Sequence, residues 1–488
     1  MAPLIENKMK NCIAVFFFVF FVFQIKGQDY HAIQGSSFAG SLGVSNNPAS
    51  IVNTPYPWDL TLFAFQLKSA TNAYTINNYS LISSAKNTYT VANNGDYGRY
   101  ADLNFNINLL NARIALNRKQ AIAMGLNMRG YGNLKTNPYN FIDTLHNVTQ
   151  FLNLNPDNSV YSGNLTTSSW LEAFATYSQT IWDDVLQRLN GGLTVKAMRG
   201  ISGAFAEMQN GTVTSAPDGV SQIYTLNSVS ARYGYSYNYD GWQNSKSSIQ
   251  NIKDFITNTR GGFSVDIGFE YLIKPQGVKT YFDDEDYYDY EWKIGISLLD
   301  FGHNQYRYGN QSHSFTGPAA NVSDSLLDQK FDSASSFTNL NDSIASVVNG
   351  FSQTGGKFKV QNPTRLVVNV DRSLGDDFYI NGELSINLSS AVSSADKLYV
   401  RELNFLTFTP RWETKRWGVY MPIQYNGDKQ FWIGGAFKAG PLLFGIHNWA
   451  NVFSRNKMQN GGGYIAIVIH PSRTTKSKTD KRLECPKQ

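Results

Sequence analysis

Residues 101–109 show the clearest pattern of apolar and polar positions in the chain. Every odd-numbered position there is apolar and every even-numbered one is polar. Alternation with a period of two predicts a β-strand whose two faces meet different surroundings. The polar face repeats Asn around one Asp, without the Lys and Glu usual on a water-exposed face. This stretch alone fits a soluble β-sandwich as well as a membrane β-barrel with a polar lumen.

Similar runs recur along the chain and predict fifteen strands. Several connections in the last third are very short, such as 413–415 and 426–429, which favours an antiparallel meander of hairpins. Single-chain bacterial barrels normally have an even number of strands, so we expect one strand more. The best candidate for this additional strand is the segment 305–315, which follows a predicted turn at 300–304. The second candidate is the segment 72–82. The fifteen predicted strands are 58–67, 100–110, 121–131, 171–180, 193–207, 222–239, 263–273, 290–299, 364–372, 378–388, 401–412, 417–425, 431–439, 441–449 and 464–470.

Composition favours the barrel. The 488 residues could form two or three soluble domains or one large barrel. Aromatic residues make up 14% and charged residues only 16%, against roughly 25% charged in typical soluble domains. The net charge of +5 comes from dispersed Lys and Arg, apart from the last residues. We therefore expect no binding of nucleic acid.

The N-terminus predicts export. Lys8 and Lys10 precede the apolar run 13–23, and the small residue Gly27 follows, as in a secretory signal peptide spanning residues 1–27. An uncleaved anchor is the weaker alternative, because the run is too short to span a bilayer comfortably. The tail 471–488 is basic and is expected to be solvated.

Both cysteines lie outside the predicted barrel, residues 57–470. Cys12 falls in the signal peptide and Cys485 in the tail, so the mature chain can form no internal disulfide. Such an exported chain must be held together by its core or by closure of its sheet.

Two segments lack strand periodicity. Residues 28–56 are rich in Gly, Ser and Asn and form either a packed irregular segment or a mobile terminus. Within 317–356, apolar residues recur at helical spacing, which predicts one or two amphipathic helices in a loop that covers the barrel mouth. Tyr and Trp near the ends of many strands suit a membrane–water interface, although they also suit an ordinary core.

Candidate chemistry is sparse. The six histidines are scattered, and no zinc, nucleophile-elbow, phosphate-loop or dinucleotide motif is present. We expect no enzyme, no cofactor and no bound metal. The acidic run Asp283, Asp284, Glu285 and Asp286 could bind Ca²⁺ or bridge lipid phosphates, but a solvated loop is the simpler reading.

The better functional candidates are polar residues on the expected inner face. In an open barrel they would select what passes, and in a filled one they would hydrogen-bond a plug. For Ile107→Arg, on the outer face, we expect a loss of roughly 2–4 kcal/mol and for Asn106→Arg a milder effect. The predicted lumen-facing residues are Asp102, Asn104, Asn106, Asp266, Glu270, Glu383, Arg401 and Arg411.

Four motifs together carry a family resemblance. They are Asn47-Pro48-Ala49, Gly262-x-Ser264-x-Asp266-x-Gly268-x-x-Tyr271, Gly295-Ile296-Ser297-Leu298-Leu299-Asp300-Phe301-Gly302 and Gly461-Gly462-Gly463-Tyr464. The chain resembles a family of Bacteroidota outer-membrane proteins that is itself similar to the long-chain fatty-acid transporters (FadL-like). The resemblance covers roughly residues 35–470.

This resemblance implies a plug formed by residues 28–56, with Asn47, Pro48 and Ala49 at its centre. One relative in the wider group is a partner in protein secretion rather than a transporter. The chain departs from common outer-membrane barrels because it runs on beyond His470 instead of ending on an aromatic residue.

The predicted fold is an all-β transmembrane antiparallel barrel of about 14–16 strands with an N-terminal luminal plug, located in the outer membrane. The leading function is uptake of a hydrophobic or amphipathic small molecule. The alternative is a non-transporting scaffold barrel that binds a secretion or surface partner protein. Outer-membrane lipid is the expected surrounding in both cases.

Overall fold

The computed structural model describes residues 31–79, 88–156, 160–217, 222–243, 245–275, 286–332, 335–393, 396–450 and 457–471. The predicted signal peptide and nearly all of the basic tail lie outside these ranges.

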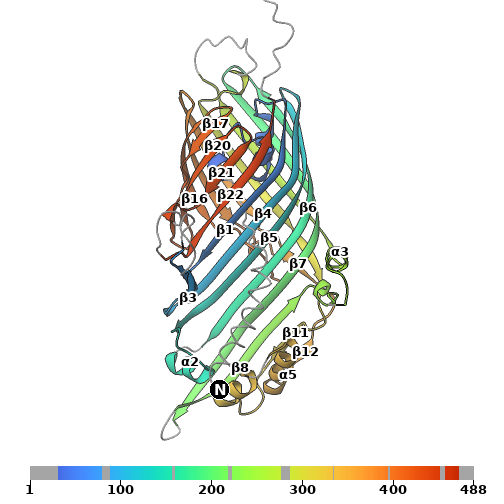
Figure 1. Cartoon of the computed structure of the whole chain (residues 1–488), viewed down its shortest axis with the longest axis vertical. Helices are drawn as coiled ribbons and strands as arrows, with labels where there is room; N and C mark the ends of the chain where they lie inside the picture. Colours follow the sequence, from blue (N-terminus) through green and yellow to red (C-terminus); the bar gives the residue numbers. More distant parts are fainter. Residues whose placement is uncertain are drawn as a thin grey trace, which may run out of the picture.

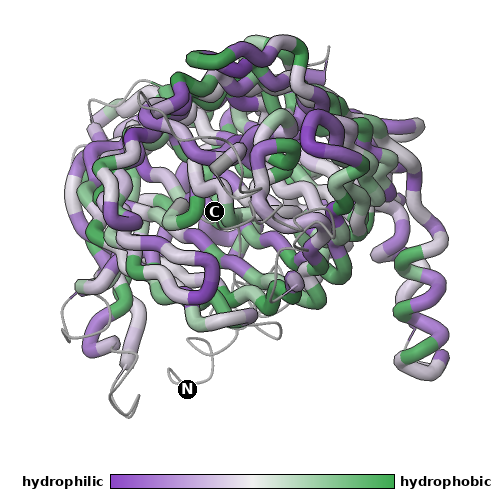
Figure 2. Tube along the Cα trace, turned by 90° about the horizontal axis from the view of Figure 1, so that it is seen from above, coloured by the Kyte–Doolittle hydropathy of each residue, from purple (hydrophilic) through white to green (hydrophobic). Residues whose placement is uncertain are grey.

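An antiparallel sheet of fourteen wall strands closes into a barrel (Figures 1 and 2). Closure occurs at β1, which pairs with β4 on one side and with β22 on the other. Three of the wall strands are interrupted and consist of two segments each. In ring order the wall strands are β1 (Trp58–Thr71), β4 (Gly95–Asn117), β5 (Gln120–Phe141), β6 (Tyr161–Asp183), β7 (Gln187–Pro217), β9 (Gly261–Ile273), β10 (Trp292–Arg307), β13 with β14 (Lys357–Gln361 and Arg365–Gly375), β15 (Phe378–Asn387), β16 (Phe405–Glu413), β17 with β18 (Trp417–Tyr420 and Ile423–Asn426), β19 with β20 (Phe431–Ile433 and Gly435–Ala439), β21 (Leu442–Ile446) and β22 (Asn460–Ile469).

The expectation of one missing strand is wrong, because the fifteen predicted strands include one that is not in the wall. This strand is β8 (Gln222–Tyr235), which pairs with the outer half of β7 and with the short β11 (His313–Thr316) beyond the ring. β7 is long enough to pair with β9 along its first half and to form a projecting hairpin with β8 along its second. Alternation alone does not distinguish a projecting hairpin from the wall.

Neither candidate for the extra strand belongs to the wall as a strand of its own. The predicted turn at 300–304 is absent, because β10 continues through it to Arg307. Asp300 has a positive φ of 57° there, and the register with β9 shifts between Leu298 and Phe301, as at a β-bulge. In the second candidate region, β2 (Tyr74–Asn77) pairs with β3 (Tyr89–Ala92) in a separate two-stranded sheet, and Ile76 forms an isolated bridge with Met458.

The two ends of the barrel differ. At the turn end, upper in Figure 1, most connections are short, as between Asn117 and Gln120 and between Asp183 and Gln187, and the exception runs from Ile273 to Trp292. At the opposite loop end, connections are long and carry α2 (Val148–Leu154), α3 (Ser248–Thr257), α4 (Asp324–Phe331), α5 (Phe337–Val347) and the short β12 (Ser352–Gln353). In bacterial outer-membrane barrels the short turns face the periplasm.

α4 and α5 pack on the projecting hairpin. Val322, Ile344 and Val347 form a small apolar cluster with side chains of β8 and β11. No helix in the described part of the chain is both long and apolar enough to cross a membrane.

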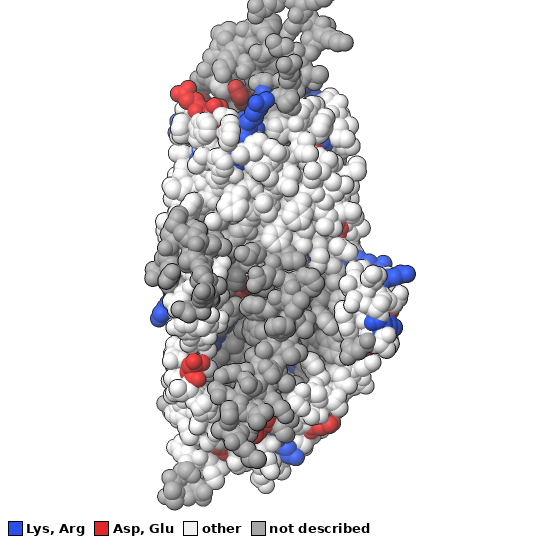
Figure 3. Space-filling model, viewed as in Figure 1, with Lys and Arg blue, Asp and Glu red and all other residues white. Residues whose placement is uncertain are grey.

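The wall has an apolar outer face and a polar inner face. On β4, Leu110 and Ile114 are about half exposed, whereas Asn104 and Asn106 are buried. Below its charged upper edge, the described surface in the upper half of Figure 3 carries almost no Lys, Arg, Asp or Glu. Exposed aromatic residues lie near the ends of wall strands, such as Trp58 at the start of β1. This is the outer surface expected of strands that contact lipid.

Candidate functional site

The N-terminal segment, residues 31–57, packs against inward-facing side chains of the wall. It contains three 3-10 turns, η1 (His31–Ile33), η2 (Gly40–Ser45) and η3 (Pro48–Val52). η3 begins as capping rules predict: Asn47 accepts a hydrogen bond from the Ala49 amide at 2.9 Å, and Pro48 takes the first position of the turn. The Asn47 side chain also donates to the Phe269 carbonyl of β9 at 2.9 Å.

Two wall glycines make room for this turn. A Cβ atom at Gly192 of β7 would collide with the Pro48 carbonyl, and one at Gly268 of β9 would collide with the Asn47 side chain. Gly268 belongs to a motif that carried the resemblance, and the contact gives that motif a physical reason: only glycine leaves room for the Asn47 side chain at this position.

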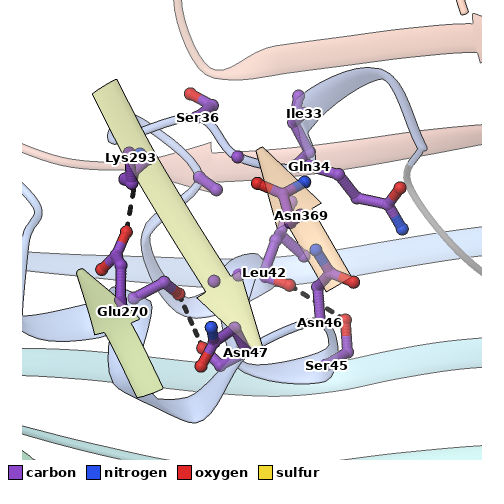
Figure 4. Close-up of a pocket in the computed structure, with 15 residues that line it drawn as sticks. Ile33, Gln34, Ser36, Leu42, Ser45, Asn46, Asn47, Glu270, Lys293 and Asn369 are labelled. Carbon is purple, nitrogen blue, oxygen red and sulfur yellow. Dashed lines mark hydrogen bonds and ion pairs between the residues drawn. The ribbon is translucent and has the colours of Figure 1, made fainter. Parts of the chain in front are cut away.

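A second motif also contacts the turn. Ser297 of β10 donates to the Asn46 carbonyl at 2.7 Å, and the Asn46 amide donates to Glu383 at 3.2 Å. Figure 4 shows Asn46 and Asn47 facing Glu270, Lys293 and other side chains that line a pocket beside the segment.

Arg113 of β4 joins the end of the segment to the wall. Its Nε lies 2.5 Å from Asp59 of β1, and its other nitrogens donate to the carbonyls of Ile51 and Tyr56. Both charged side chains are almost fully buried. Burial raises the pKa of Tyr56, so its hydroxyl stays protonated and donates to the Lys415 carbonyl at 3.1 Å.

A cluster of five charged side chains lies deeper in the lumen. Asp300 pairs with Arg129 through two hydrogen bonds of 2.6 and 2.7 Å and with Lys196 at 2.6 Å. Lys196 also contacts Asp266 at 2.8 Å, and Arg129 contacts Glu172 at 3.4 Å. Because all five are nearly fully buried and three carboxylates face two cations, removing Arg129 or Lys196 would leave buried carboxylates without a counter-ion.

A second non-strand segment, residues 398–404, enters the lumen between β15 and β16. Its Glu402 lies 2.5 Å from Lys68 and accepts from Asn104 at 2.7 Å. Arg365 lies 4.0 Å from Glu402 and donates to the Ser45 carbonyl at 3.1 Å, which links the two inserted segments. The predicted strand start at 401 is therefore wrong, since the β-strand begins at Phe405.

An apolar layer lies beside this second segment. Trp170 and Tyr131 stack at 5.6 Å between ring centroids, and Phe358 packs on Tyr306. Leu398, from the inserted segment, belongs to the same cluster. The lumen is thus filled by polar contacts around the N-terminal segment and by aromatic contacts around residues 398–404.

Two cavities in the described lumen are small. One, between the N-terminal segment and the wall, has a volume of about 30 Å³ and is lined by Asn46, Asn47, Glu270 and Lys293 among others (Figure 4). The second, about 20 Å³, lies beside Arg129. Each is roughly the size of one water molecule.

The structure brings some of the predicted lumen-facing residues into contact with one another or with the inserted segments. Asp102 pairs with Arg401 at 2.7 Å, and Arg411 pairs with Asp371 of β14 at 2.6 Å. Asn106 donates to Asn108 on the same strand. Except for the partly exposed Arg401, all of the predicted residues are buried.

Of the acidic run, Asp283, Asp284 and Glu285 lie outside the described residues, and Asp286 begins the short turn η5 (Asp286–Tyr288). Among the residues that the structure describes, no group of three or more His, Cys, Asp or Glu side chains is placed to hold a metal ion.

The sequence analysis missed Arg113, Gly192 and Glu402. Arg113 occupies an inward position of an alternating strand, so a charged residue among apolar neighbours was an available signal. Gly192 and Glu402 had no local signal, because their roles depend on segments far away in the chain.

The chain was compared with known proteins. The model of a family of unknown function (DUF5723) matches residues 48–447. No curated protein matches. Similar solved structures include a FadL homologue from Pseudomonas aeruginosa, with 9% identity, 91% of this chain and 98% of that chain covered, and a TM-score of 0.42. A deltaS2 mutant of the TodX monoaromatic hydrocarbon channel gives 9% identity, coverages of 91% and 98%, and a TM-score of 0.43. The outer membrane protease OmpT from Escherichia coli has 8% identity, with 85% of this chain and 95% of that chain covered, and a TM-score of 0.22. Sequence identities and TM-scores this low carry no information on a substrate or a reaction of this chain.

Proposed function

The chain belongs to the family of unknown function DUF5723, and we propose that it is an outer-membrane barrel that takes up a hydrophobic or amphipathic small molecule. On this proposal residues 31–56 act as a plug, with Asn47, Pro48 and Ala49 at its centre, and the lumen opens when the plug moves.

The observation that carries the proposal is how the lumen is filled. In a barrel of eight strands the wall side chains fill the interior, whereas 16–18 strands leave an aqueous channel. A ring of fourteen strands lies closer to the second case. Here the space is occupied by two segments that are not wall strands, residues 31–57 and 398–404. Such segments can move without breaking the wall.

The chemistry of the two layers suits an apolar or amphipathic cargo. The aromatic cluster around Trp170 lies beside residues 398–404, so movement of this segment would expose an apolar surface inside the barrel. Aromatic rings can also accept the polar end of an amphipathic molecule.

A second candidate is a non-transporting barrel that docks a secretion or surface partner. The small cavities favour it, because spaces of about 30 and 20 Å³ hold no apolar ligand in the closed state. Exposed apolar side chains at the loop end, such as Phe337 on α5, also suit contact with another protein.

A disulfide that holds the plug against the wall distinguishes gated uptake from docking of a partner. Ser41 Oγ of the plug and Thr61 Oγ1 of β1 lie 2.8 Å apart, so Ser41→Cys with Thr61→Cys would place two thiols next to each other for oxidation to a disulfide. The background carries Cys12→Ser and Cys485→Ser. Cells expressing each variant are tested for uptake of radiolabelled oleate and radiolabelled toluene.

Gated uptake predicts entry of at least one probe with the wild-type chain, loss of entry in the oxidised double variant, and recovery with dithiothreitol. Ser41→Cys alone is the matched control and should retain uptake. Uptake that is equal in locked and reduced protein would exclude the plug as the gate. Absence of uptake in every form, together with one partner protein that co-purifies reproducibly, would overturn transport in favour of docking.

A further inference from the structure

Helix α3 lies outside the barrel wall. It connects the projecting β8 strand to β9 and extends from the ring at the right of Figures 1 and 2. Ser247 caps its N-terminus by accepting from the Gln250 amide at 3.2 Å.

The wall holds this helix in a fixed orientation. Arg199, an outward-facing residue of β7, donates to two main-chain carbonyls in the last turn of α3. Asn238 is buried and donates both to a β7 carbonyl and to the Phe255 carbonyl at 2.9 Å. The Phe255 ring packs edge-on against Tyr239 and Trp242 at 5.0 and 6.2 Å. The orientation of the exposed face is therefore set by the barrel.

That exposed face is apolar. Ile249, Ile252 and Ile256 share it, being spaced by three and four residues. Ile249 is 82% exposed and Ile252 is 51% exposed, although branched aliphatic side chains are usually buried. The face continues the outer surface of the wall, because Phe263 of β9, shortly after the helix, is also more than half exposed.

The helix lies where the apolar outer surface ends. On β7, the outward positions Leu193 and Val195 are apolar, and the same row of positions reaches the charged Arg199. In an outer-membrane barrel, this change marks the boundary between acyl chains and headgroups.

Positive charge surrounds the apolar face. Lys253, Arg260 and Arg199 are exposed, and Figure 3 shows blue side chains gathered at the edge where α3 lies in Figure 1. The one acidic residue of the helix, Asp254, pairs with Lys246 at 2.9 Å. An apolar face edged by cations is the composition of helices that lie in a lipid interface and contact anionic headgroups.

We propose that α3 is seated in the outer leaflet of the membrane, with Ile249 and Ile252 among acyl chains and Arg199, Lys253 and Arg260 against phosphate-bearing lipid headgroups. The occupant of this surface is lipid because the face is continuous with the lipid-facing wall and carries complementary charge. Seating of α3 does not depend on the proposed uptake, since it concerns the outer surface alone.

Site-specific fluorescence tests the seating. The full-length chain with both native cysteines replaced by Ser receives either Ile249→Cys or the matched control Gln250→Cys, each labelled with the environment-sensitive dye NBD. Gln250 is exposed and lies about 100° around the helix from Ile249, off the apolar face. Both proteins are inserted into vesicles of phosphatidylcholine with phosphatidylglycerol, with doxyl groups on the acyl chains as quenchers. A heat-dependent shift in gel mobility verifies folding of each variant.

We expect quenching by doxyl lipid to be about threefold stronger at position 249 than at 250. The pair Lys253→Glu and Arg260→Glu should reduce quenching at 249 in vesicles that contain phosphatidylglycerol and leave it unchanged in phosphatidylcholine alone. Addition of inorganic phosphate should not imitate the lipid. Equal quenching at both positions would overturn the seating, as would efficient disulfide dimerisation through Ile249→Cys, which would assign the face to a second copy of the chain. A 249 probe shielded only in the presence of a co-purified protein would assign it to that partner instead.

Discussion

Replacing Arg113 by Ala removes the guanidinium that joins the N-terminal segment to the barrel wall. Asp59 would remain buried without its counter-ion, and breaking a buried ion pair in this way costs about 3–5 kcal/mol. The Ser41 amide still donates to Asp59 at 2.7 Å, so we expect the lower end, about 3 kcal/mol. If this free energy is lost from docking of the N-terminal segment, the fraction of molecules whose segment is released from the wall rises about a hundredfold.

Limited proteolysis of the purified protein in vesicles measures that fraction through cleavage within residues 31–57, and urea unfolding measures the total loss. Lys119→Ala is the matched control, because Lys119 is 58% exposed and lies 3.5 Å from Asp183. An exposed pair of this kind contributes less than about 1 kcal/mol. Combining Arg113→Met with Asp59→Asn should restore part of the stability, since no lone charge remains. If Arg113→Ala costs no more than Lys119→Ala, the segment is not held by this contact.

Three further perturbations test the packing of the wall and lumen. Ile107→Arg should lower the stability of the assembled barrel by about 2–4 kcal/mol, as judged by the heat-dependent gel shift. Asn106→Arg, expected from the sequence to be milder, should now cost at least as much, because Asn106 is 1% exposed in a filled lumen that has little room for the longer side chain. Gly192→Ala should cost about 1–3 kcal/mol and expose the N-terminal segment to protease, whereas Gly382→Ala, whose Cβ would meet nothing closer than 3.9 Å, should be nearly neutral. Trp170→Ala should cost about 3–5 kcal/mol in urea unfolding, and a cost below about 1 kcal/mol would mean that the aromatic layer is loosely packed.

The barrel architecture could be predicted because sorting of side chains between the two faces is a local property. Residues 101–109 carry it in full: Asn104 and Asn106 are buried, and Leu109 is exposed. The same local rule failed for β8, because a hairpin that projects beyond the wall alternates like the wall itself. Whether a strand joins the ring depends on its partner, and no short window of sequence encodes the partner.

The contents of the lumen were less predictable. The resemblance suggested that Asn47, Pro48 and Ala49 lie inside, but their contacts with Gly192 and Gly268 join positions far apart in the chain. Segment 398–404 read as the start of a strand, since burial of Glu402 beside Lys68 becomes visible only once the ring is closed. Charged residues that pair with one another across a lumen show no regular spacing in the sequence, so no sequence pattern predicts the pairs.

The N-terminal segment also determines how the ring can be assembled. Ala32 and Leu42 of the segment share one apolar cluster with Ala64 of β1 and with Tyr464 of β22, the two strands that meet at the closing seam. The N-terminal segment therefore packs in part against β22, which comes last among the wall strands in the order of the chain. Because the segment lies on the inner side of that seam, pairing of β22 with β1 also completes the apolar contacts of Ala32 and Leu42, so closure of the wall and burial of the segment are coupled.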